Sequence, residues 1–130
     1  MNKNSYPDIY FGLKGGFNNF GIVTNFNVRV VPQTHVYAGI IFYVLPQFRA
    51  VFQAMANFQA MNKDPKAAIS GFLTFAGGQL LLLLYCIYDA SVAPTGTFDG
   101  FLAIPHTFTT LQSQSFFSFI QSTANPALPR

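Results

Sequence analysis

Residues able to hold a cofactor through main-chain atoms are concentrated near the amino terminus, at positions 15–23. Gly15, Gly16 and Gly21 lack a Cβ atom, so their amides can come within hydrogen-bonding distance of a ring or a pyrophosphate. A helix cap followed by a turn explains the same glycines without any ligand, so the residues alone leave both interpretations open. A dinucleotide-fold fingerprint is excluded, because it follows a strand and opens a helix, whereas the expected order here is helix, glycines, strand.

Nucleophilic and metal-dependent chemistry has little support elsewhere in the chain. Cys86 lies in an apolar run, where a free cysteine is usually a small buried hydrophobe rather than a reactive thiol. His35 and His106 are expected in loops, and neither has a base close to it in sequence. Together with four acidic residues, these three show no metal-ligand spacing. We therefore predict no catalytic residue and no metal site in this chain.

Composition indicates a globular unit with much apolar surface. The chain has 130 residues, of which 51% are hydrophobic and 8% charged, and it contains 16 phenylalanines. Such a chain fits one domain and is far from a disordered composition. Its formal charge of +3 comes from scattered basic residues, which argues against nucleic-acid binding. The longest apolar run, residues 80–88, is shorter than the roughly 20 residues of a membrane helix, so we expect no membrane span.

The first elements surround the glycine run. Residues 7–14 are expected to form a short helix with Asp8 as N-cap and Lys14 in its last turn. After Gly15 and Gly16, residues 20–31 alternate apolar and polar side chains, the period of a half-buried strand.

The remaining pattern predicts an antiparallel α+β unit. Residues 37–44 are apolar and β-branched, which favours a strand, and residues 46–61 carry an amphipathic helical stripe. That stripe consists of Phe48, Val51, Phe52, Met55 and Phe58. Residues 69–75 and 80–88 flank a Gly77–Gly78 turn and predict a hairpin. Residues 89–100 are expected to be loop and residues 113–122 a short helix.

Four tyrosines alternate with apolar residues along the expected strands. They are Tyr37, Tyr43, Tyr85 and Tyr88. Packing on the sheet is the preferred explanation, since aromatic residues favour strands for that reason, and contact with a substrate is the alternative.

Residues 7–32, PDIYFGLKGGFNNFGIVTNFNVRVVP, resemble the "DLFWAL(R/K)GG…NFGIVT" segment of FAD-linked oxidases of the berberine-bridge-enzyme-like group, within the vanillyl-alcohol-oxidase superfamily. The matching positions are Asp8, Leu13, Lys14, Gly15, Gly16, Asn19, Phe20, Gly21, Ile22, Val23 and Thr24. The chain departs at Phe11, Gly12 and Phe17, where the family usually has Trp, Ala and Gly. Residues 98–105, FDGFLAIP, are similar to the "F.PFL.IP" loop of the same group.

The resemblance implies a fold and a cofactor. Residues 1–34 would end a PCMH-type FAD-binding domain, and residues 35–130 would begin a substrate domain built as an antiparallel sheet with helices on one face. The expected FAD contacts are Gly15, Gly16, Asn19, Gly21, Ile22 and Val23. Of these, residues 21–23 would lie along the flavin through backbone atoms, and the glycine pair would shape the turn. Asn19 either contacts the cofactor or stabilises the turn.

The resemblance also implies a reaction, namely hydride transfer from an alcohol, sugar, alkaloid-like or polyketide-like substrate to flavin, which oxygen reoxidises. The family places its flavin attachment upstream of this segment and its base downstream, so we expect this chain alone to be inactive. Its expected partners are a small-molecule substrate and the missing remainder of a parent chain. The family includes secreted members, but no secretory-type signal is visible here. The alternative function is a non-catalytic α+β interaction module.

Overall fold

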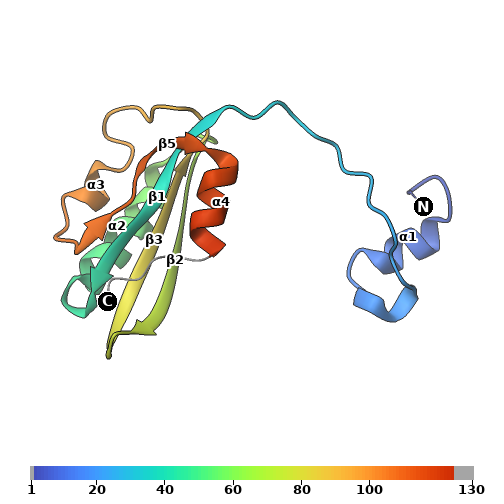
Figure 1. Ribbon diagram of the computed structural model, residues 1–130, viewed down its shortest axis with the longest axis horizontal. Coiled ribbons are helices and arrows are strands. Elements are labelled where there is room, and N and C mark those ends of the chain that lie inside the picture. The colour runs from blue at the N-terminus through green and yellow to red at the C-terminus, as the bar shows by residue number, and fades with distance from the viewer. Residues whose placement is uncertain (1, 125–130) are drawn as a thin grey trace. The chain divides into compact units, whose positions relative to one another are not determined.

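A computed structural model describes residues 2–124 of the chain (Figure 1). The chain divides into two compact units, Met1–Val31 and Pro32–Arg130. The first contains two short helices, and the second contains a sheet with its own helices. The predicted division of a larger parent into domains at residues 34 and 35 stays a prediction, because compact units of one chain do not define the domains of a longer one.

The first unit consists of helix α1 (Pro7–Leu13) and the 3-10 helix η1 (Phe17–Phe20). The prediction that Asp8 caps α1 is wrong. Tyr6, with φ of 61°, is the N-cap residue, and Asp8 lies inside the first turn. A proline is favoured at the first helical position, so the N-cap lies two residues earlier than the acidic side chain suggested. Lys14 is the C-cap residue rather than part of the last turn.

The predicted strand at residues 20–31 is also wrong. No strand is assigned from residue 21 to residue 34, and the chain there is exposed. Phe26, Val28 and Val30 are 76%, 76% and 87% exposed. A strand needs a neighbour to accept and donate its ladder hydrogen bonds, and no described strand pairs with this segment. The alternation therefore marks two distinct faces of an extended segment without forming a strand.

The second unit is built on a five-stranded antiparallel sheet, which confirms the predicted α+β class. The strands are β1 (His35–Val44), β2 (Ala67–Ala76), β3 (Gln79–Tyr88), β4 (Phe108–Thr109) and β5 (Gln112–Ser115). Their order is β2-β3-β1-β4, and β5 also pairs with β1. The central position of β1 and β3 explains why these two strands are nearly all apolar.

The predicted hairpin is confirmed as β2 and β3, with Ala76 paired to Gln79 across a two-residue turn. Gly77 and Gly78 have φ of 58° and 78°. Both values fall in the left-handed region that a type I′ turn requires, and such a turn matches the twist of the two strands. The turn sequence therefore sets the register of the whole hairpin.

One face of the sheet packs against helix α2 (Phe48–Met61) and the short helix α3 (Asp99–Leu102). The core under these helices is made of Ile41 and Tyr43 from β1, Leu82, Leu84 and Cys86 from β3, Phe48 and Val51 from α2, and Phe101 from α3. The predicted helix at residues 46–61 is confirmed, with its first residues in the 3-10 helix η2 (Leu45–Gln47). Phe52, assigned to the buried stripe, is 47% exposed instead, and Ala54 packs in the stripe.

The other face carries helix α4 (Phe116–Ala124). Its Phe119 packs with Val36 and Ala38 of β1, so helices lie on both faces of the sheet rather than on one (Figure 1). On the same face, the rings of Phe42 and Phe108 stack with centroids 4.1 Å apart. The helix predicted at residues 113–122 begins only at Phe116, because the residues before it form β5 and pair with β1.

Candidate functional site

The glycine run of the first unit forms a tight turn closed by an aromatic ring. The amide of Gly16 donates to the carbonyl of Gly12 at 2.8 Å, and the amide of Asn19 donates to the carbonyl of Gly16 at 3.2 Å. The ring of Phe20 packs against Gly12 and Gly16, and a Cβ atom on Gly16 would collide with that ring. Gly16 is therefore required for the turn itself.

Gly21, the next glycine, leads out of this turn in a conformation that other residues rarely adopt. Its φ is 139° and its ψ is 176°, and no atom lies within 4 Å of the position where a Cβ would be. Gly21 is therefore needed for its backbone geometry, and its main chain is open to an approaching group. The space beside Gly15 is equally open.

A hollow of about 1010 Å³ lies beside this turn, within the first unit. Its lining includes Gly21, Ile22 and Val23, so three of the six predicted contact residues share one cavity. Gly15, Gly16 and Asn19 are not part of that lining. The hollow therefore contains residues 21–23 of the predicted contacts but not the glycine pair.

Eight further residues line the hollow that the sequence did not identify as contacts, and two of them could meet a cofactor's charge or rings. Lys14 and Tyr10 both contribute to it, and the Lys14 ammonium lies 4.7 Å from the centre of the Tyr10 ring. Lys14 belongs to the motif that matched the flavin oxidases, which was the available signal. Asn19 is exposed, and its side-chain amide makes no hydrogen bond with the described residues. Asn19 contributes its main-chain amide to the turn, and contact of its side chain with a cofactor stays a prediction.

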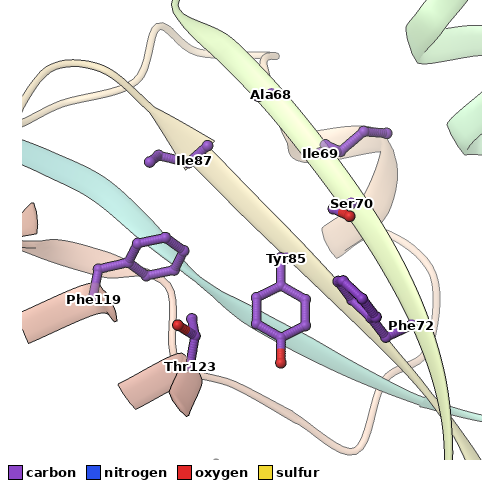
Figure 2. Close-up of a pocket in the computed structure, with 8 residues that line it drawn as sticks. All are labelled: Ala68, Ile69, Ser70, Phe72, Tyr85, Ile87, Phe119 and Thr123. Atoms are coloured by element: carbon purple, nitrogen blue, oxygen red, sulfur yellow. The ribbon is translucent and has the colours of Figure 1, made fainter. Parts of the chain in front are cut away.

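A second hollow, of about 540 Å³, lies on the sheet face that carries α4 (Figure 2). We call it the β2–α4 groove. Its walls are Ser70 and Phe72 from β2, Tyr85 and Ile87 from β3, and Phe119 and Thr123 from α4. Figure 2 shows Tyr85 standing between the α4 side chains and those of β2. The Phe72 and Tyr85 rings meet edge to face, with centroids 5.2 Å apart.

The four tyrosines of the strands differ in their surroundings. The Tyr43 hydroxyl is buried and donates to the carbonyl of Phe101 at 2.8 Å. The Tyr88 hydroxyl donates to Oδ2 of Asp64 at 3.0 Å, and Tyr37 packs against the core under α2. Only Tyr85 lines a hollow, where partial burial raises the pKa of its phenol. Packing explains the other three, as predicted.

The cysteine and histidines provide no reactive centre. Cys86 is fully buried, which confirms its expected role as a small hydrophobe, and burial raises the pKa of its thiol to about 12. His35 is the first residue of β1, so its assignment to a loop is wrong. His106 does lie in a loop, with Nδ1 3.0 Å from the carbonyl oxygen of Ile104. Within residues 2–124, no three His, Cys, Asp or Glu residues are grouped to hold a metal ion, and no helix is long and apolar enough to cross a bilayer.

The chain is similar to several proteins whose names refer to FAD and to one that is named an oligopeptidase. The "Uncharacterized FAD-linked oxidoreductase" of Arthroderma benhamiae is 32% identical over 120 residues, which are 92% of this chain and 24% of that protein. The "FAD-dependent monooxygenase drtC" of Aspergillus calidoustus is 39% identical over 70 residues, which are 53% of this chain and 13% of that protein. "Oligopeptidase PhomG'" of Diaporthe leptostromiformis is 29% identical over 125 residues, but the match covers only 10% of it.

The chain thus spans a quarter or less of each of these relatives. No protein-family model and no solved structure matches it. Further relatives are also named FAD-dependent monooxygenases. The chain is therefore a homologue of one segment of FAD-linked oxidoreductases and FAD-dependent monooxygenases.

Proposed function

We propose that this chain is the segment of an FAD-dependent oxidoreductase that joins the end of a PCMH-type flavin domain, residues 1–34, to the start of the substrate domain, residues 35–130. The observation that carries the proposal is the open backbone of residues 21–23 at the hollow of the first unit, in a motif similar to that of berberine-bridge-like oxidases. The names of the relatives support the cofactor.

The residues around the hollow fit FAD in charge and shape. Gly21 leaves its main chain free to accept or donate a hydrogen bond at close range. Ile22 and Val23, 95% and 47% exposed, offer apolar surface to a planar ring. Lys14 supplies a cation at the same hollow, and a cation suits the phosphates of a dinucleotide. Gly16 is proposed to support this surface by holding the turn, and Gly15 and Asn19 are proposed to contact the cofactor.

In this proposal the cofactor supplies the redox chemistry and the chain supplies binding and orientation. FAD held beside residues 21–23 and Lys14 would supply two-electron redox chemistry, with a substrate carbon as hydride donor and oxygen as the final acceptor. The first unit would hold the flavin through the main chain of residues 21–23 and through Lys14. No described residue of this chain is assigned as the base, so the chain alone is proposed to be inactive.

Absorbance tests the proposal directly. The purified chain is mixed with FAD, passed over gel filtration and scanned from the ultraviolet to the visible. A flavin band that travels with the protein supports the assigned contacts, and Gly21→Ala should weaken it, because an added Cβ cannot adopt φ of 139° without strain. Gly96→Ala is the matched control, since Gly96 has φ of 92° and equally open surroundings in the other unit.

Three results contradict the proposal in different ways. A colourless protein peak would show that these residues do not hold FAD in this chain. An equal effect of both substitutions would place the cofactor away from residues 21–23. Stable association with an unrelated protein, without flavin, would instead favour the non-catalytic interaction module.

A further inference from the structure

The β2–α4 groove has the size of a small-molecule site and is open to solvent on its β2 side. Its volume of about 540 Å³ lies inside the roughly 300–1,000 Å³ typical of such sites. Strands β2 and β3 form its floor, and helix α4 forms one wall. Ser70, Tyr85 and Phe119, which are far apart in the sequence, therefore meet at this groove (Figure 2). The groove is separate from the hollow of the first unit, and it lies on the opposite sheet face from α2.

Three hydroxyl groups give this apolar groove a limited polar edge. The hydroxyls of Tyr85 and Ser70 make no hydrogen bond with the described residues, so each can donate and accept. Thr123 donates its proton to the carbonyl of Ile120 at 2.8 Å, and its oxygen is left to accept. The Tyr85 and Ser70 hydroxyls can therefore donate a hydrogen bond to a ligand, and all three hydroxyl oxygens can accept one.

Charge and polarity restrict what fits between these walls. None of the described lining residues carries a charge. A ligand ion would lose its hydration without gaining a counter-charge, which is costly. A sugar would also fit poorly, because its many hydroxyls would be left unpaired against Ile87, Phe72 and Phe119. Ring edges and faces suit these aromatic and branched side chains.

We propose that the β2–α4 groove binds a neutral, mostly apolar ring compound that carries one or two hydroxyl or carbonyl oxygens, held by the Tyr85 and Ser70 hydroxyls. Binding of this class follows from the groove alone. That the compound is also the molecule to be oxidised rests on the proposed function. Sugars, carboxylates and cationic amines are then excluded as preferred substrates of this site.

Three compounds with the same ring system and different polar groups test the proposed class of ligand. 2-Naphthol carries one hydroxyl, naphthalene carries none, and 2-naphthoate carries a negative charge. Each is titrated into the full chain without FAD, and binding is followed by methyl NMR shifts of Ile87 in the groove and of Ile41, which lies in the core under α2. We expect 2-naphthol to bind best and to shift Ile87 but not Ile41.

Tyr85→Phe removes one hydroxyl and keeps the ring. We expect it to weaken 2-naphthol binding by about 2- to 12-fold, the effect of one neutral hydrogen bond. Ser70→Ala should act in the same direction. Tyr37→Phe is the matched control, because this tyrosine packs on the opposite face, and it should leave binding unchanged.

Two results would overturn the proposal. One is 2-naphthoate binding as tightly as 2-naphthol, and the other is Tyr85→Phe and Ser70→Ala both behaving like Tyr37→Phe. Because no flavin is present, these outcomes are independent of the absorbance test. A chain that binds 2-naphthol but no FAD would keep the groove and refute the flavin site.

Discussion

Leu84→Ala and Leu73→Ala together test whether the second unit folds around its own core. Leu84 is 0% exposed in the centre of β3, whereas Leu73 is 56% exposed on β2 of the same hairpin. Removing a fully buried leucine side chain costs about 2–5 kcal/mol, because transfer energy is lost and a cavity remains. Full burial of such a side chain is worth about 1.5–3 kcal/mol, so a half-exposed leucine should cost about 1 kcal/mol or less.

The predicted difference is large enough to measure in this chain. For about 100 ordered residues, 1 kcal/mol shifts Tm by about 4–8 °C, so about 3 kcal/mol for Leu84→Ala corresponds to about 15 °C. Because the chain has no tryptophan, far-UV circular dichroism during urea and thermal unfolding is the suitable assay. Equal losses for the two variants, or a larger loss for Leu73→Ala, would refute the core described for this sheet.

Two further predictions concern a buried thiol and an exposed segment. Cys86 should resist Ellman's reagent at pH 8 until urea unfolds the chain. Since the pKa of its thiol rises from 9.0 to about 12 on folding, the unfolded state loses this proton first, and the free energy of unfolding should fall as pH rises from 9 to 12. Cys86→Ala should flatten that slope, and an unchanged slope would contradict the assignment. Amides of residues 22–31 should exchange with deuterium unprotected, while those of β1 are protected; comparable protection would indicate a strand.

Elements defined by local chemistry were predictable from the sequence. The Gly77–Gly78 turn fixes its hairpin, and the apolar spacing from Phe48 to Phe58 fixes α2, because both signals lie within a few residues of the structure they describe. The α+β class followed from these elements. The additional strands β4 and β5 were missed, since polar residues such as Gln112 and Ser113 pair only because β1 lies beside them.

The strand predicted at residues 20–31 was wrong because pairing depends on a distant part of a fold. Its alternation describes side-chain faces, but a ladder also needs a partner strand that local sequence does not supply. Of the predicted contacts, residues 21–23 came from a motif contained in one short segment, and the structure shows that they line one hollow. The β2–α4 groove was not found, because Ser70, Tyr85 and Phe119 come together only through the fold.

Strand β2 has consequences for handling the protein. It is ten residues long, contains no charged residue or proline, and pairs on one side only, with β3, among the described strands. Natural edge strands usually carry a lysine, a proline or a bulge that discourages pairing with another molecule. With Phe72 and Phe75 56% and 72% exposed beside this free edge, we expect self-association to rise steeply with concentration. Leu73→Lys would place a charge on this edge strand and should lower self-association at a given concentration.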